Sequence, residues 1–84
     1  MTSFTLEDLG TVLEEAAGAP ETGAWDEEAF DLPFYELGYD SLALLEATAR
    51  IGRSFAVTIP DDAVVQMKTP RTAVEYVNTL IERG

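Results

Sequence analysis

Apolar residues spaced three or four positions apart are the feature that most limits how this chain can fold. Leu6, Leu9 and Leu13 follow this spacing and predict a first helix. Thr5 is a suitable N-cap for that helix, and Gly18 is a suitable end. No two segments show the alternating pattern of paired strands. The spacing therefore predicts an all-α fold.

Two further helices are expected from the same signals. One begins at Asp40 or Ser41 and runs to about Arg53, with apolar residues at helical spacing throughout. The other has Thr69 as its N-cap and Pro70 at its first helical position, where the missing N–H of proline costs nothing. Together with the first, these make three main helices.

The segment between residues 19 and 40 has no helical period, yet it carries large apolar side chains such as Trp25. A connection this long is unusual in a compact domain unless its own side chains pack it. We expect this loop to lie against the helices and to hold a short helical turn near Glu27–Phe30. A brief helix is also expected from Asp61. The predicted architecture is a bundle of three main helices plus one short helix, with a long first loop.

The chain is short and strongly acidic. Its 84 residues suffice for a single domain, residues 1–84, and 16 Asp and Glu against 5 Lys and Arg give a net charge of −11. This charge repels nucleic-acid phosphates and anionic lipids, so neither nucleic acid nor a membrane is an expected partner. Basic partner proteins are favoured instead. With no cysteine, no secretory signal and no apolar span, a cytoplasmic location is expected.

The residue types that are missing exclude most catalysis. The chain contains neither histidine nor cysteine, so it can form neither a Ser-His-Asp triad nor a thiolate nucleophile. The neighbouring acids Asp61 and Asp62 would not face each other on a helix. The acidic stretch at residues 26–31 lacks the glycine of a calcium loop. The chain is therefore predicted not to be an enzyme, and no metal site or catalytic residue is expected.

One position stands out as a candidate site. Ser41 lies at the predicted start of a helix, directly after the turn that contains Gly38. Asp40 and Ser41 could simply cap that helix, because their oxygens can accept hydrogen bonds from its free N–H groups. The same geometry would also expose the Ser41 hydroxyl to a modifying enzyme. It would place a phosphate ester near the positive end of the helix dipole. Both interpretations remain open on the residues alone.

The surroundings of Ser41 resemble a known family. Residues 34–46, with Asp40-Ser41-Leu42 at their centre, are similar to the Asp-Ser-Leu motif of acyl carrier proteins. More narrowly, they resemble the discrete carriers of bacterial type II (aromatic) polyketide synthases. The resemblance continues in residues 57–62 and 69–71, in the same order and spacing. It implies an acyl-carrier-like helical bundle.

The resemblance also implies a cofactor and partners. In the family, 4′-phosphopantetheine is attached to the motif serine, here Ser41, with Asp40 beside it. The chain would then carry malonyl and growing poly-β-keto groups as thioesters on the cofactor's thiol. The implied partners are a phosphopantetheinyl transferase, a malonyl transferase, the ketosynthase/chain-length factor, and a tailoring ketoreductase or cyclase. The carrier itself is expected to be a monomer.

The helix after the serine is the docking surface of the family. Here this implies docking roles for Asp40, Leu42, Leu45, Glu46 and Ala49, although Leu42 and Leu45 could equally be core residues. The opposite face, with Leu44, Thr48 and Ile51, is the better candidate for the core and could also line a cleft for the acyl chain. Two alternative functions stay open: a carrier of fatty-acid or aminoacyl groups, or an unmodified acidic helical interaction module.

Overall fold

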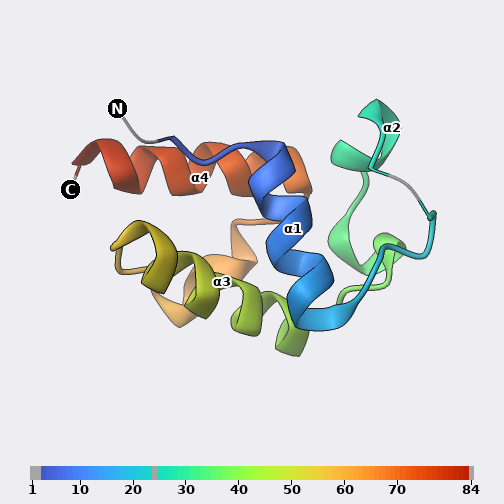
Figure 1. The fold of residues 1–84 in the computed structure, drawn as a ribbon, viewed down its shortest axis with the longest axis horizontal. Coiled ribbons are helices and arrows are strands. Elements are labelled where there is room, and N and C mark those ends of the chain that lie inside the picture. Colours follow the sequence, from blue (N-terminus) through green and yellow to red (C-terminus); the bar gives the residue numbers. More distant parts are fainter. Residues whose placement is uncertain (1–2, 24, 84) are drawn as a thin grey trace.

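The computed structural model describes residues 3–23 and 25–83, and all regular structure within them is helical. The elements, in chain order, are α1 (Leu6–Ala17), α2 (Glu27–Phe30), the 3₁₀ helix η1 (Phe34–Leu37), α3 (Ser41–Phe55), the 3₁₀ helix η2 (Asp61–Val65) and α4 (Pro70–Arg83). Figure 1 shows α3 and α4 along opposite sides of the molecule, with α1 crossing between them. The predicted all-α class and the three main helices are confirmed.

The first helix begins and ends as its sequence predicts. The Asp8 N–H donates to Thr5 Oγ1 over 3.0 Å, and the Thr5 N–H donates back to Asp8 Oδ2 over 3.1 Å. This reciprocal pair satisfies two N–H groups that the helix cannot bond itself. Gly18 ends α1 with a φ of 91°, which a residue with a side chain rarely adopts.

The other main helices differ from expectation only at their ends. α3 continues past Arg53 to Phe55, whose ring packs edge-to-face on Phe4 with centroids 5.2 Å apart. That tertiary contact favours the two additional residues, and Phe55 follows Ile51 at helical spacing in the sequence. At the start of α4, the Thr72 N–H donates to Thr69 Oγ1 over 3.2 Å, as the N-cap prediction requires. In the sequence, Gly84 is a suitable stop for this helix, but it lies outside the described residues.

The short elements were predicted less completely. The helical turn at Glu27–Phe30 is present as α2, and the brief helix from Asp61 is present as the 3₁₀ helix η2. The 3₁₀ helix η1 was not predicted, because its four residues are too few to show a period. Each 3₁₀ helix is preceded by a proline, and neither has a side-chain hydrogen bond that caps its start.

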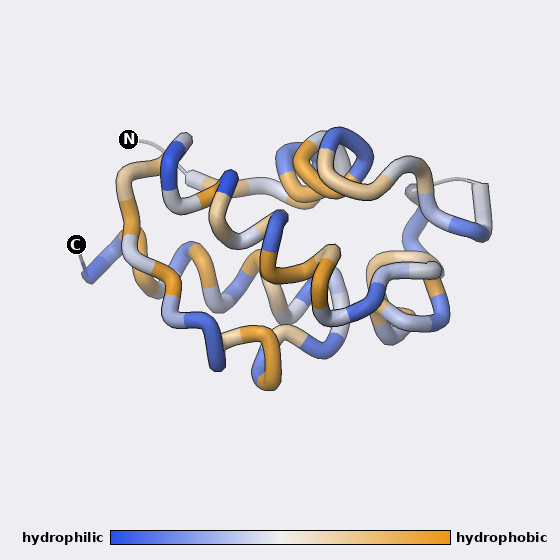
Figure 2. The backbone as a smooth tube through the Cα atoms, turned by 90° about the horizontal axis from the view of Figure 1, so that it is seen from below, coloured by the Kyte–Doolittle hydropathy of each residue, from blue (hydrophilic) through white to orange (hydrophobic). Residues whose placement is uncertain are grey.

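The core lies where the three main helices meet. Figure 2 shows hydrophobic and hydrophilic residues alternating along each helix, as in helices that bury one face. The largest fully buried side chains come from every part of the described chain: Phe4, Leu9, Leu13, Leu37, Ile51, Met67, Pro70 and Val77. Phe4 is fixed further by Asn78 of α4, whose side-chain amide exchanges two hydrogen bonds of 2.8 Å with the Phe4 backbone. This pairing keeps the N-terminal segment beside α4.

The long first loop packs on the helices, as expected. Trp25 is half-buried, and its ring lies nearly parallel to the rings of Phe30 and Tyr39, each with centroids 6.1 Å away. Its Nε1–H donates to Glu14 Oε2 of α1 over 2.9 Å. Gly10 permits this approach, since a Cβ there would stand only 3.2 Å from Trp25 Nε1. Trp25 therefore packs the loop on α1.

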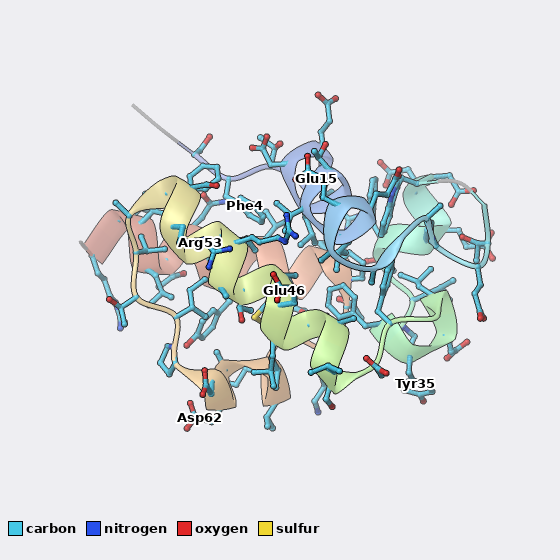
Figure 3. The ribbon with its side chains drawn as sticks, turned by 60° about the horizontal axis from the view of Figure 1, so that its bottom comes forward. Phe4, Glu15, Tyr35, Glu46, Arg53 and Asp62 are labelled. Atoms are coloured by element: carbon cyan, nitrogen blue, oxygen red, sulfur yellow. The ribbon has the colours of Figure 1, made fainter. Side chains whose placement is uncertain are left out.

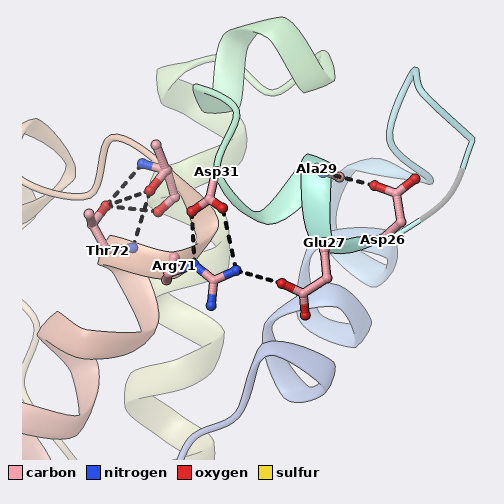
Figure 4. Close-up of polar contacts among 7 residues, drawn as sticks. Asp26, Glu27, Ala29, Asp31, Arg71 and Thr72 are labelled. Atoms are coloured by element: carbon pink, nitrogen blue, oxygen red, sulfur yellow. Dashed lines mark hydrogen bonds and ion pairs between the residues drawn. The ribbon is translucent and has the colours of Figure 1, made fainter.

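Ion pairs connect α2 to α4. Arg71 donates from Nε to Asp31 Oδ1 over 2.8 Å and from Nη2 to Glu27 Oε2 over 3.1 Å (Figure 4). The hydrogen bond to Asp31, together with the charges of Asp31 and Glu27, raises the pKa of Arg71 above its ordinary value. None of the helices in residues 3–23 and 25–83 has the length and apolar character that crossing a membrane requires.

Candidate attachment site at the start of α3

The structure separates the roles of Asp40 and Ser41. Asp40 is the N-cap of α3, and its Oδ1 accepts the Ala43 N–H over 2.9 Å. Ser41 is the first residue of the helix and is exposed. Within the described residues its hydroxyl has no hydrogen-bond partner. Because Asp40 does the capping, the Ser41 hydroxyl is free to react.

The turn before Ser41 is firmly held. Gly38 ends η1 in the left-handed region, with a φ of 95°, and a Cβ there would come within 2.6 Å of Glu21 Cγ. Tyr39 is buried, and its hydroxyl donates to the Gly18 carbonyl over 2.8 Å. Burial, aided by the negative charge of Glu14, raises the pKa of Tyr39 to about 12. The turn is thus attached to the end of α1, and it fixes where Ser41 lies.

An open groove of about 610 Å³ begins at Ser41. Its walls come from η1, the start of α3, η2 and the segment before α4. The lining residues are mostly apolar: Pro33, Phe34, Tyr35, Tyr39, Asp40, Ser41, Leu44, Val64, Met67 and Lys68. Leu44, Thr48 and Ile51 form the face of α3 that was expected to be core or to line a cleft. Leu44 lines this groove, whereas Thr48 and Ile51 are buried away from it. The Thr48 hydroxyl is satisfied by the Leu45 carbonyl, 2.9 Å away.

Four of the five residues expected to dock partners recur at helical spacing on one side of α3, here called its outward side: Leu42, Leu45, Glu46 and Ala49. The fifth, Asp40, is the N-cap directly before them. Leu42 is 76% exposed, so the alternative that it belongs to the core is wrong. Leu45 is half-buried, while Asp40, Glu46 and Ala49 are exposed. A second hollow, of about 430 Å³, lies between the end of α1 and the start of α3, and Asp40, Leu42 and Glu46 line it.

Arg50 makes this outward side less acidic than its composition suggests. Its Nε donates to Glu46 Oε2 over 3.1 Å, and its Nη1 lies 3.8 Å from Glu15 Oε1 of α1. Figure 3 shows Glu46 on α3, with Glu15 on the neighbouring α1. Glu46 can meet a basic partner only by sharing its charge with Arg50. The apolar side chain of Leu42 has no ion pair that a partner would have to share.

Sequence reasoning missed several residues of the groove. Val64, Met67 and Lys68 come from η2 and the segment after it, more than twenty positions from Ser41. They lie in short elements without a helical period, so no local pattern connects them to the serine. Lys68 alone carried a signal, since it is the one lysine of the chain.

The site contains no group that would activate the serine. The chain has no histidine, and the Asp40 carboxylate is already engaged by the Ala43 N–H. No cluster of acidic side chains in the described residues is arranged to hold a metal ion. An exposed, unactivated hydroxyl at the head of a helix is suited to receive a group from another enzyme and to present it. Fold and site together describe a carrier domain.

Comparisons with known proteins agree with this class. Residues 7–77 match the family model described as the phosphopantetheine attachment site. The oxytetracycline polyketide synthase acyl carrier protein of Streptomyces rimosus is 46% identical over 78 residues, 93% of this chain and 82% of that protein. The actinorhodin polyketide synthase acyl carrier protein of Streptomyces coelicolor is 39% identical over 77 residues, 92% of this chain and 90% of that protein.

Solved structures give the same result. The 3,5-dioxohexyl carrier protein of the actinorhodin synthase from Streptomyces coelicolor, a triketide mimic, superposes with a TM-score of 0.84 at 36% identity, covering 99% of this chain and 96% of that one. The oxytetracycline acyl carrier protein superposes with a TM-score of 0.81 at 43% identity, covering 99% of this chain and 87% of that one.

The chain therefore belongs to the acyl carrier proteins of type II polyketide synthases, within the phosphopantetheine-attachment family. The cofactor of this family is 4′-phosphopantetheine, and its members are carriers that serve the enzymes of a synthase rather than catalysts. The resemblance seen in the sequence is confirmed. The two alternatives, another kind of acyl carrier and an unmodified interaction module, are not favoured.

Proposed function

We propose that Ser41 receives the 4′-phosphopantetheine arm and that the chain carries malonyl and growing poly-β-keto groups on it as thioesters. The observation that carries this proposal is the exposed Ser41 hydroxyl, which is left free because Asp40 caps α3. The open groove beside Ser41 gives a pantetheine chain room to lie along the protein. The residues present therefore fit the group.

The attachment needs chemistry that the chain does not supply. Ser41 Oγ attacks the phosphorus of coenzyme A next to the pantetheine, forms a phosphodiester, and displaces adenosine 3′,5′-bisphosphate. Its proton passes to a base on the transferase, because this chain has no histidine and Asp40 is occupied. The cofactor, when bound, supplies the thiol for the thioester, which suits a carrier that has no cysteine.

The proposed partners are a phosphopantetheinyl transferase, a malonyl transferase, the ketosynthase/chain-length factor, and a tailoring ketoreductase or cyclase. They meet the outward side of α3, where Leu42 offers an exposed apolar contact beside the acids Asp40 and Glu46. An apolar centre with charges at its edge is the usual composition of a protein interface. The net charge of −11 speeds encounter with basic enzymes. A cytoplasmic location stays a prediction.

Mass spectrometry tests the attachment. The purified chain is incubated with coenzyme A and a phosphopantetheinyl transferase of broad specificity, and its intact mass is measured. We expect a gain of one phosphopantetheine group, with no gain in Ser41→Ala. Ser54→Ala is the control, because it makes the same change at an exposed position of the same helix away from the site, and it should gain the arm like the wild type. An unchanged mass for the wild-type chain, or a gain that persists in Ser41→Ala, contradicts the proposal.

A second experiment tests the docking side. Loading of the arm-bearing chain by a malonyl transferase is compared for Leu42→Ala and Val65→Ala. Val65 is the matched control, since it is 69% exposed on η2, against 76% for Leu42 on α3. We expect kcat/KM to fall about 10-fold for Leu42→Ala, as for loss of one good apolar contact, and to change little for Val65→Ala. Equal losses in the two variants would mean that α3 has no special part in docking.

A further inference from the structure

Lys68 is held rigidly at the wall of the groove that begins at Ser41. Its backbone carbonyl accepts the Phe34 N–H over 3.1 Å, which ties it to η1. Met67 before it is 1% exposed, and Thr69 after it caps α4. The root of the lysine side chain is thus fixed from three directions, while the residue itself is exposed and lines the groove.

The charge of Lys68 has no partner in the described part of the chain. Arg50 and Arg71 each contact two carboxylates there, but Lys68 makes no ion pair, although the chain carries 16 acids. Among the residues that line the groove, Lys68 is the only cation, and Asp40 is the only acid. The Asp40 carboxylate already accepts the Ala43 N–H. The groove therefore offers an anion one uncommitted ammonium group.

We propose that the Lys68 ammonium group binds the phosphodiester through which the arm joins Ser41. This inference rests on the proposed function. Attachment adds one more negative charge to a chain of net charge −11, and Lys68 is the cation that shares a groove with the modified serine. An ammonium donates up to three charge-assisted hydrogen bonds to phosphate oxygens. Lys68 thereby directs the root of the arm along the groove, toward Leu44 and Met67, instead of out over Leu42.

Lys68 is therefore a positioning residue and not a catalytic one. Tyr35, 75% exposed, lies at the outer edge of the same groove and points away from the body of the protein (Figure 3). None of the other residues that line the groove is cationic, so a phosphodiester there finds no second cationic side chain among them. Substitution of Lys68 should leave the attachment itself possible and change where the attached group lies.

The single lysine permits a direct test. Reductive methylation with ¹³C-formaldehyde labels only Lys68 and the α-amino group, and it leaves both charged. We expect the Lys68 methyl signal to shift when the chain acquires its arm, while the α-amino signal stays in place. The shift should shrink in about 1 M salt, where the screening length falls to about 3 Å. Ser41→Ala, treated identically, should show no change.

A second measurement follows the phosphorus itself. The ³¹P signal of the arm-bearing chain should move in Lys68→Gln and return in Lys68→Arg, which restores the charge. Arg53→Gln is the matched control, because it removes one exposed cation from the last turn of α3, away from the groove. Its ³¹P signal should match that of the wild-type chain.

The outcomes separate the two proposals. If the wild-type chain does not gain the mass of the arm, the proposed attachment fails. If the arm is attached but the Lys68 methyl signal does not shift, or Lys68→Gln leaves the ³¹P signal unmoved, the role of Lys68 is overturned while the attachment stands. A ³¹P change of equal size in Arg53→Gln would also overturn it, since the effect would then be one of net charge alone.

Discussion

Tyr39 determines more of the site than its position beside the motif suggests. It is 2% exposed, its ring lies parallel to that of Trp25, and its hydroxyl donates to Gly18 at the end of α1. One side chain thus joins the first loop, the first helix and the turn that carries Ser41. Its phenolate would be costly, because burial and the nearby charge of Glu14 raise its pKa from 10.0 to about 12.

The stability of the fold should therefore fall in alkaline solution through Tyr39. The pKa is higher in the folded state, so the group stabilises the fold fully below pH 10, and this contribution is lost as the pH rises toward 12. At pH 8 we expect Tyr39→Phe to lose about 1 kcal/mol with its hydrogen bond. Urea unfolding at a series of pH values should show the gap between wild type and Tyr39→Phe closing above pH 10. A gap that stays constant would contradict this account.

The site could be predicted from the sequence only in part. The sequence placed Ser41 and Asp40 at the start of a helix but could not say which of them caps it, because both side chains are capable of it. The answer depends on which side-chain oxygen accepts the Ala43 N–H, and only the folded structure shows that it is Asp40 Oδ1. Likewise Leu42 and Leu45 were equal candidates for burial. They differ in exposure because α1 and η2 pack against α3 and leave its other side open to solvent.

At the scale of the helices, Gly52 is a glycine that a tertiary contact requires. In the sequence it appears as a weak point near the end of α3. In the structure the chain folds back over it, the Val57 N–H donates to its carbonyl, and a Cβ would stand 2.9 Å from the Val57 oxygen. Backbone atoms cannot yield as a side-chain end can. Glycine is therefore required by packing and not merely tolerated.

Gly52→Ala should consequently destabilise the protein. Helix propensity alone would predict a gain of about 1 kcal/mol, but crowding against backbone costs about 1–3 kcal/mol. We expect a net loss of about 1 kcal/mol in urea unfolding. Ser54→Ala, an exposed change to the same residue in the same helix, should be neutral or slightly stabilising. A stabilised Gly52→Ala would show that the following segment moves away at little cost.

The ion pairs of Arg71 make a separate prediction about α2. This helix has only four residues and cannot be stable alone, so its contacts with α4 must support it. Arg71→Gln should speed amide exchange in α2, for example at Phe30, and leave exchange at Leu9 in α1 unchanged. In about 1 M salt the difference should vanish, because these pairs are exposed. Arg83→Gln, at the far end of α4, is the control, and an equal effect there would exclude a local role.

For the whole molecule, the sequence predicted the elements better than their arrangement. Helical spacing, caps and breakers act within a few residues, so α1, α3 and α4 were found with small errors at their ends. The groove is different: it joins residues 33–44 to residues 64–68. These meet because the chain turns back after α3, so that η2 packs against that helix. Only a resemblance to proteins of known fold could have anticipated a groove at that place.

The response of the protein's stability to salt is also a property of the whole molecule. With a net charge of −11, repulsion among carboxylates acts over the whole surface, whereas the described part of the chain holds four ion-pair contacts, all exposed. Screening should weaken repulsion more than attraction. Raising sodium chloride from about 10 mM to 0.5 M should thus raise Tm by several degrees, since about 1 kcal/mol corresponds to roughly 4–8 °C in a domain of this size.

Arg71→Gln provides a sharper test, because it removes two ion pairs and makes the net charge one unit more negative. Its Tm should rise with salt by at least as much as that of the wild type, measured by circular dichroism in chloride to avoid the general stabilising effect of sulfate. A Tm that falls with salt in the wild type would mean that the few ion pairs outweigh the distributed repulsion. The net negative charge would then not destabilise the folded protein. Faster encounter with basic enzymes would be its remaining physical consequence.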